Sequence, residues 1–257
     1  MKPLYSFFLI CLIISACTGC MHKQDTIADF SADNLWMLFQ QKQTSSAPVM
    51  LGSLRFGIQN DTRRVTYMLW SAGKADDVAE RIRLEINAGA GTPVCSAMFE
   101  DDRMTILLHQ EARAVTGYAT KENLKKILGI SLPFEIRQLK QFLCGNYYHS
   151  LNDPTPKNST VLANGSVIYH IEHDGADARL ELNASSLPTG MITADGWDLT
   201  FAYGNDSLPV KMMGKIKSAD GDILFHLLVK SRSAFTKNAE WNFDIPAHYQ
   251  RFFLDAQ

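Results

Sequence analysis

The sequence has neither a strong excess of charge of one sign nor a run of basic residues. Its 257 residues include 25 Lys and Arg and 27 Asp and Glu, which gives a formal net charge of -2 at pH 7. A protein that binds nucleic acid through the phosphate backbone needs a concentrated positive surface, and no Lys/Arg-rich segment supplies one. We therefore expect no nucleic-acid partner.

Sequence motifs of catalysis and cofactor binding are also absent. The chain has no Gly-x-Ser-x-Gly, His-Glu-x-x-His or Gly-x-Gly-x-x-Gly segment. The densest group of metal-ligand residue types lies at 170–174, but His170 and His173 would point to opposite faces of a strand. The five cysteines have spacings that fit no zinc pattern. The sequence therefore predicts no enzyme activity, no metal and no cofactor.

Only one long apolar run is present, and it lies at residues 4–14, after Lys2. It is shorter than the ~20 apolar residues that a membrane-spanning helix needs. The sequence ISAC (14–17) follows, and small residues after a short apolar run are typical of a cleaved export signal. The segment resembles a bacterial lipoprotein signal, in which the Cys after two small residues is acylated and becomes the new N-terminus. This resemblance implies lipidation at Cys17, with Cys20 as the alternative.

Two other cysteines, Cys95 and Cys144, fall in a predicted strand and at the end of a predicted helix. In an exported protein they could form a disulfide. A small buried side chain is equally typical of an unpaired cysteine. The sequence leaves both alternatives open.

From residue 50 onward, the periodicity of apolar residues predicts a mainly β domain. Short runs in which apolar and polar residues alternate are separated by turn residues, as in antiparallel strands that follow one another. About eleven such runs are present, at 50–58, 65–70, 79–86, 94–99, 104–108, 112–118, 167–170, 178–182, 197–203, 210–216 and 223–229.

Helical spacing predicts three helices. The first begins near Ser31 and places Leu35, Leu38 and Phe39 on one face. The second spans 120–128, and the third begins at Pro133 and ends before Gly145. Residues 146–165, which are rich in Asn, Pro, Ser and Thr, are expected to form a loop.

The order of these segments resembles the LolA/LolB family of lipoprotein carriers and receptors. LolB is the closer match because it is itself a lipoprotein. The matching segments cover roughly residues 50–230 and read GSLRF (52–56), YMLW (67–70), GYAT (117–120), LGISLP (128–133), LKQFLCG (139–145), GWDLTFAY (196–203) and LP (208–209).

The resemblance implies a mainly β (α+β) fold, an incomplete and highly curved antiparallel barrel of about eleven strands with lid helices over its opening. Its apolar interior would hold the acyl chains of lipoproteins. Alternation along the strands supports an apolar interior independently, although the same pattern is typical of side chains that fill a solid core. The candidate cavity residues are Leu54, Phe56, Tyr67, Leu69, Ile106, Leu108, Leu124, Leu139, Phe142, Leu199, Phe201 and Met212.

The expected domain organisation follows from these segments. Residues 1–16 are a lipoprotein signal peptide, 17–47 a tether and N-terminal helix, 48–231 a LolB-like half-barrel, and 232–257 a C-terminal extension that packs on the barrel. The resemblance implies a lipid-anchored protein on the periplasmic face of the outer membrane that receives lipoproteins from a periplasmic carrier of the LolA type. The alternative is a non-catalytic lipid-binding or scaffold lipoprotein of the cell envelope without receptor activity.

The chain departs from LolB-type receptors at one loop. In those receptors the loop between the third and fourth strands carries an exposed Leu that assists membrane insertion. The equivalent stretch here is NAGAGT (87–92), with Ala90 where the Leu is expected. Replacing Leu by Ala forfeits about 1.5–3 kcal/mol of apolar transfer free energy. Membrane contact through Ala90 is therefore expected to be weak.

Overall fold

The computed structural model describes residues 31–42, 49–58, 61–72, 80–129, 131–173, 175–219, 221–234 and 241–254. The described residues from Ala32 to Leu254 form one compact unit. Cys17 and Cys20, the two predicted lipidation sites, lie outside the described residues. None of the described helices combines the length and the apolar character that crossing a bilayer requires.

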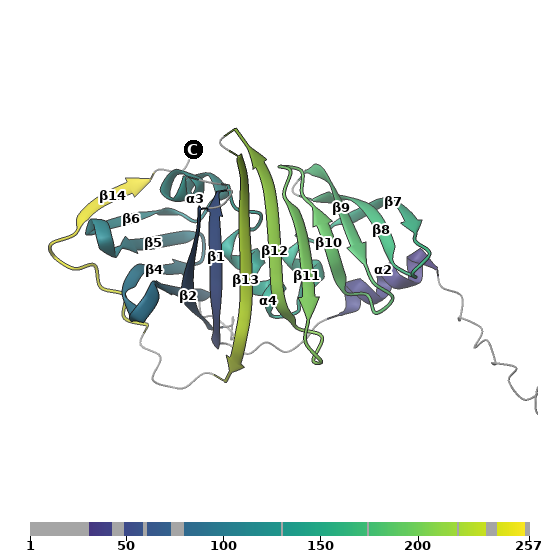
Figure 1. Ribbon diagram of the computed structural model, residues 1–257, viewed down its shortest axis with the longest axis horizontal. Helices are drawn as coiled ribbons and strands as arrows, with labels where there is room; N and C mark the ends of the chain where they lie inside the picture. Colours follow the sequence, from purple (N-terminus) through teal and green to yellow (C-terminus); the bar gives the residue numbers. More distant parts are fainter. Residues whose placement is uncertain are drawn as a thin grey trace, which may run out of the picture. The chain divides into compact units, whose positions relative to one another are not determined.

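The described residues form one sheet of fourteen strands, which curls without closing (Figure 1). Neighbouring strands run antiparallel, except that β14 pairs in parallel with β6. The spatial order is β14-β6-β5-β4-β3-β2-β1-β13-β12-β11-β10-β9-β8-β7, so that β1 joins the two halves of the sheet. The strands are β1 Val49–Ile58, β2 Asp61–Ala72, β3 Arg81–Asn87, β4 Pro93–Glu100, β5 Arg103–Leu108, β6 Arg113–Tyr118, β7 Thr155–Val161, β8 Val167–His173, β9 Ala176–Leu182, β10 Pro188–Ile192, β11 Asp198–Tyr203, β12 Pro209–Ser218, β13 Gly221–Ser233 and β14 Gln250–Leu254.

Four α-helices lie in the described residues: α2 Ala32–Gln41, α3 Lys121–Leu128, α4 Ile136–Leu143 and α5 Tyr147–Ser150. The local sequence explains where α3 begins and ends. The Thr120 hydroxyl accepts a hydrogen bond from the Asn123 backbone N–H (3.2 Å), and Gly129 ends the helix in the left-handed conformation with φ 73°. At the start of α4, the N-cap residue Glu135 and Gln138 in the first turn form a reciprocal capping box.

The helices cover one face of the sheet, which we call the inner face. Residues directly opposite each other on neighbouring strands share a face. The ring of Phe142 in α4 lies 4.5 Å from the ring of Phe201 in β11, measured between centroids. The ring of Trp36 in α2 lies 4.8 Å from that of Tyr169 in β8. The opposite side, the outer face, is turned toward the viewer in Figure 1, in front of α4.

The expected fold class is confirmed, since the structure is an unclosed, curled, mainly antiparallel sheet with helices. The strand number is fourteen rather than about eleven. The three strands without a predicted counterpart are β7, β10 and β14. All seven residues of β7 are exposed and lack apolar alternation. Backbone hydrogen bonds to β8 define this strand. Such bonds leave no pattern of side chains in the sequence from which the strand could be predicted.

Two helix predictions need correction. Leu38 is 55% exposed, and Trp36 instead is buried beside Leu35 and Phe39. The third helix begins at Ile136 rather than Pro133, because Glu135 provides its cap. Residues 146–165 are not a continuous loop, since they include α5 and β7. The alternation predicted for His170 and His173 is confirmed, with His170 exposed and His173 buried on β8.

Candidate functional site

The strand register places all nine predicted cavity residues of the sheet on the inner face. In the β13 half, Leu227 lies opposite both Leu54 and Met212, and Met212 lies opposite Phe201. In the other half, Ile86 of β3 lies opposite Tyr67 of β2. Cys95 of β4 lies opposite both Ile86 and Leu108 of β5. The residues so placed are Leu54, Phe56, Tyr67, Leu69, Ile106, Leu108, Leu199, Phe201 and Met212.

These residues, together with the three on helices, fall into two environments. Eight are buried: Tyr67, Leu69, Ile106, Leu124, Phe142, Leu199, Phe201 and Met212. Four are half-buried: Leu54, Phe56, Leu108 and Leu139. The first group is enclosed by the protein itself, whereas the second retains apolar surface that another molecule can contact.

Aromatic side chains fill the inner face beneath α2, α4 and α5. Phe142 lies 5.1 Å from Tyr147 and 5.8 Å from Phe134, measured between ring centroids, in addition to its contact with Phe201. The Tyr147 hydroxyl donates a hydrogen bond to the Ser207 carbonyl (2.6 Å). Phe142 and Tyr147 are fully buried. This half of the inner face is therefore a packed core.

The inner face of β1 to β5 is covered less completely. Half-buried apolar side chains continue from strand to strand there, and we call this set the inner apolar surface. Its members are Leu54, Phe56, Val65, Leu84, Ile86, Cys95 and Leu108. Only three of them were predicted as cavity residues, although the others alternate in the same way. Partly exposed apolar groups gathered on one face offer contact area to an apolar ligand.

Helix α4 is held beside this surface by ionic contacts. The Lys140 ammonium lies 3.1 Å from one Glu80 carboxylate oxygen, and the Arg137 guanidinium lies 3.9 Å from the other. Glu80 directly precedes β3. At the other end of α4, the Arg232 guanidinium donates hydrogen bonds to the carbonyls of Leu143 and Pro209. These contacts connect α4 to both halves of the sheet.

Two polar groups of the inner face are strongly desolvated. Burial raises the pKa of the Cys95 thiol to about 12. Burial also raises the pKa of the Tyr67 phenol well above its usual range, although the nearby positive charge of Arg232 opposes this shift. The raised pKa values keep both groups neutral well into the alkaline range, as their apolar surroundings favour. Cys95 and Cys144 are not joined by a disulfide.

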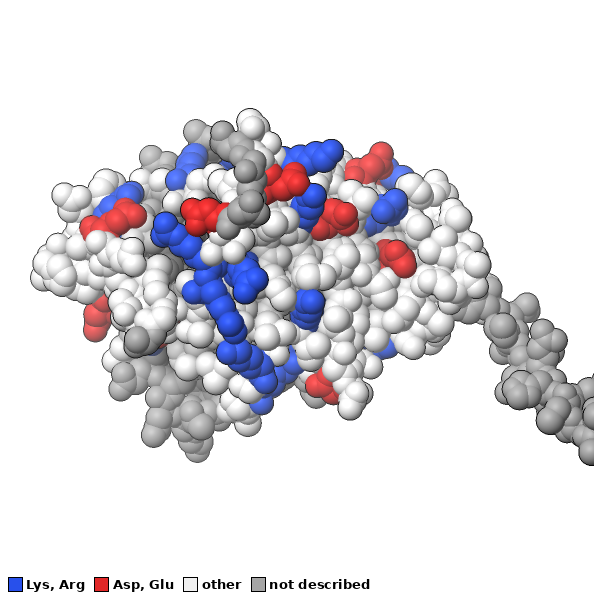
Figure 2. Space-filling view, viewed as in Figure 1, with Lys and Arg blue, Asp and Glu red and all other residues white. Residues whose placement is uncertain are grey.

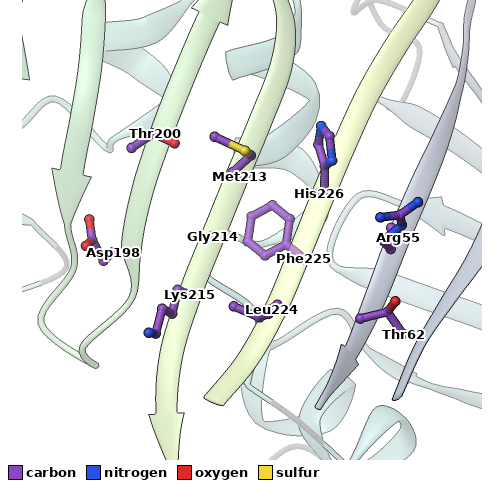
Figure 3. Close-up of a pocket in the computed structure, with 10 residues that line it drawn as sticks. All are labelled: Arg55, Thr62, Asp198, Thr200, Met213, Gly214, Lys215, Leu224, Phe225 and His226. Atoms are coloured by element: carbon purple, nitrogen blue, oxygen red, sulfur yellow. The ribbon is translucent and has the colours of Figure 1, made fainter. Parts of the chain in front are cut away.

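A mixed hollow lies mainly on the outer face of the sheet, where strand register places all of its lining residues except Gly214 and Phe225, and we call it the outer hollow. It has a volume of about 390 Å³. Strands β1, β2, β11, β12 and β13 contribute its lining, which Figure 3 shows as Arg55, Thr62, Asp198, Thr200, Met213, Gly214, Lys215, Leu224, Phe225 and His226. No sequence motif singled out these residues, because they come together only through strand pairing.

A Ser–His–Tyr contact lies elsewhere on the outer face. Ser96 Oγ is 2.8 Å from His109 Nε2, and His109 Nδ1 is 2.8 Å from the Tyr249 hydroxyl. A serine nucleophile needs a histidine that a third group orients, normally a carboxylate that stabilises the imidazolium. A neutral phenol supplies no such charge. We assign this contact a structural role, since it attaches the segment before β14 to β4.

Two further predictions concern the loop at Ala90 and metal binding. Ala90 lies in the short 3-10 helix Gly89–Gly91 between β3 and β4, and its part in membrane contact stays a prediction. In the part of the chain that the structure describes, no three His, Cys, Asp or Glu side chains come together in a way that would hold a metal ion.

Comparisons with known proteins show a likeness in fold. No protein-family model and no curated protein matches the sequence. A domain described as that of an outer membrane lipoprotein-sorting protein from Vibrio parahaemolyticus is 12% identical with a TM-score of 0.53, over 82% of this chain and 92% of that one. A DUF1329 family protein from Desulfovibrio piger is 10% identical with a TM-score of 0.54, over 80% and 92%. A LolA superfamily protein from Nitrosomonas europaea is 9% identical with a TM-score of 0.48, over 80% and 94%.

Proposed function

We propose that this chain is a LolB-like lipoprotein receptor that holds acyl chains against its inner apolar surface. In this proposal it is a non-catalytic protein anchored to the periplasmic face of the outer membrane. The anchor is a lipid on Cys17, with Cys20 as the alternative. Lipoproteins would arrive from a periplasmic carrier of the LolA type.

The observation that carries the proposal is the partial exposure of the inner apolar surface. Leu54, Phe56 and Leu108 lie on the helix-covered face of the sheet, yet all three stay half-buried. Each methylene that moves from water into an apolar site contributes about 0.8 kcal/mol. An acyl chain that covers these side chains therefore gains substantial free energy, and the fold likeness to a lipoprotein-sorting domain supports this ligand class.

The proposed anchor rests on the sequence pattern at residues 14–17. Stable membrane attachment requires more than one acyl chain. A multiply acylated Cys17 meets this requirement without help from the loop at Ala90. Thr18 follows Cys17, and the absence of Asp at that position is consistent with sorting to the outer membrane in enteric-type bacteria.

Lipid extraction tests whether the inner apolar surface holds acyl chains. The full chain is purified from bacterial membranes, washed in lipid-free detergent, and its bound lipid is extracted and identified by mass spectrometry. We expect acyl-chain lipid or lipopeptide in the wild type and much less in Phe56→Trp, which places a larger ring on the inner face. Leu51→Trp is the matched control, because Leu51 lies on the outer face of the same strand and is 37% exposed.

Transfer tests the receptor role separately. A LolA-type carrier loaded with a labelled lipoprotein is mixed with wild-type or variant protein, and movement of the label is followed. Transfer to the wild type and to Leu51→Trp, but not to Phe56→Trp, is the expected result. If the wild type binds lipid but receives no lipoprotein from the carrier, the receptor role is refuted and the alternative of a lipid-binding lipoprotein remains. A wild type without bound lipid and without transfer would refute acyl-chain binding itself.

A further inference from the structure

Basic side chains gather at the centre of the outer face. Figure 2 shows Lys and Arg in a diagonal stripe over β2, β1 and β13. Arg55 of β1 lies directly opposite Arg64 of β2 on one side and His226 of β13 on the other. Lys211 of β12 lies opposite Leu228, two residues along β13 from His226. The whole chain has a net charge of -2, so this positive region is a local concentration.

No carboxylate among the described residues lies within ion-pair distance of Arg55, Arg64 or Lys211, whereas Lys215 has Asp222 at 2.7 Å. The pKa of His226 reflects this arrangement. Burial lowers it from its usual value, and the positive charges of Lys211 and Arg55 lower it further. The centre of the outer face therefore has an unbalanced positive potential that favours an anionic ligand.

The outer hollow lies within the same region and adds apolar contact area. Met213 is 40% exposed, and Leu224 lines the hollow between β12 and β13 (Figure 3). Arg55 and His226 stand on its β1 side, and Asp198 and Lys215 stand on its β11 side. Cations beside apolar groups suit an amphiphile with an anionic head.

We propose that the outer face of β1, β2, β12 and β13 docks on a membrane surface by binding the headgroups of anionic phospholipids. Phosphates of neighbouring headgroups would contact Arg55, Arg64 and Lys211, and the glycerol and upper acyl regions would contact Met213 and Leu224. This site lies on the face opposite the inner apolar surface and does not depend on whether that surface holds acyl chains.

Vesicle binding tests the proposal with the full chain. Sedimentation measures partitioning onto vesicles of phosphatidylcholine alone and onto mixed vesicles of phosphatidylcholine and phosphatidylglycerol. Any contribution of the N-terminus is common to all variants.

Because each Lys or Arg near an anionic surface strengthens partitioning by about fivefold, Arg55→Glu/Lys211→Glu should lower the preference for mixed vesicles by about 25-fold or more. Lys125→Glu/Lys126→Glu changes the net charge equally on α3 and should retain the preference.

A footprint locates the contact on the surface. The rate at which acetic anhydride acetylates Lys211 is measured by mass spectrometry, with Lys157 on the edge strand β7 as the internal reference. Mixed vesicles should slow acetylation of Lys211 relative to Lys157, and phosphatidylcholine vesicles should not. Thermal unfolding of each variant verifies that it is folded.

Three results would overturn the proposal. The first is an unchanged preference in Arg55→Glu/Lys211→Glu, and the second is an equal loss in the α3 control, which would reflect net charge alone. The third is that soluble polyglutamate protects Lys211 while phosphatidylglycerol does not. That result would assign the outer face to an acidic protein partner instead.

Discussion

The aromatic ring of Phe225 lies over the backbone of Gly214, the residue directly opposite it on β12. A Cβ built on Gly214 would be only 2.1 Å from Cε1 of Phe225. Gly52 and Tyr67 form the same arrangement between β1 and β2, with the corresponding distance at 2.5 Å. In both pairs the glycine lets an aromatic ring lie against the sheet instead of standing up from it.

Gly214→Ala should therefore lower the free energy of unfolding. The added methyl group displaces the Phe225 ring, and such overpacking costs about 1–3 kcal/mol. Gly190→Ala is the control, because a Cβ there would meet no atom closer than 3.6 Å, and its effect should stay within about 1 kcal/mol. Urea unfolding of both variants measures the difference, and equal effects would show that the ring moves without cost.

Truncations on the inner face should separate core residues from ligand-contacting residues. Phe142→Ala should lower the free energy of unfolding by about 3–5 kcal/mol, because Phe142 is fully buried against Phe201 and Tyr147. Leu54→Ala should lower it by only about 1 kcal/mol, because Leu54 is half-buried. Lipid extraction from both variants should show that Leu54→Ala loses more bound lipid than Phe142→Ala for each kcal/mol of unfolding free energy that it loses. Equal stability costs would contradict the division of the inner face into two environments.

Alkaline pH should destabilise the fold through Cys95. Burial raises the pKa of this thiol from 9.0 to about 12. The unfolded chain loses the proton near pH 9.0, whereas the folded state keeps it. The stabilisation present below pH 9.0 is therefore lost as the pH rises toward about 12.

Urea unfolding across this pH range, for wild type and Cys95→Val, isolates the contribution of Cys95. The difference between the two proteins should change by up to about 1.4 kcal/mol per pH unit. Tyrosines that also titrate there are common to both proteins and cancel. Parallel pH profiles would show that Cys95 is solvated in the folded state.

The ion pair between Lys140 and Glu80 should have a larger coupling free energy than the shorter ion pair between Arg81 and Glu100, because it is less exposed to solvent. Their side chains are 12% and 20% exposed, whereas Arg81 and Glu100, only 2.6 Å apart, are 41% and 48% exposed. Solvent screens the exposed pair, so a double-mutant cycle should give it a coupling free energy of about 0–0.5 kcal/mol. The Lys140→Met/Glu80→Gln cycle should give about 1 kcal/mol. A larger coupling in the exposed pair would contradict this ranking.

Apolar alternation in the sequence predicted eleven of the fourteen strands. It reports a strand when one face of that strand is buried, as in β8, where buried residues alternate with exposed or half-buried ones. The edge strands β7 and β14 have mostly exposed side chains and are defined by backbone pairing with β8 and β6. Such pairing depends on a neighbour distant in sequence, so local patterns do not predict it.

The candidate site could be predicted only in part. Leu54 and Phe201 both show the alternation of an inner-face strand residue, and the register places both on that face. Their exposure differs because Phe142 of α4 packs on Phe201 and the helices leave Leu54 half-buried. The outer hollow was missed altogether, because Arg55 is far in sequence from Met213 and His226 and only the pairing of β1 with β13 brings them together.

By itself, the sequence predicted a mainly β chain, the inner face of most strands and the helix over 120–128, because these depend on residues within a few positions of one another. The unclosed barrel was expected from the resemblance to the LolA/LolB family. Only the tertiary structure decided which inner-face side chains are packed into the core and which remain half-buried. It alone also brought Arg55, Lys211 and His226 together on the outer face. Both outcomes depend on which distant segments share a sheet and where the helices lie on it, and burial and electrostatic potential arise only from that arrangement.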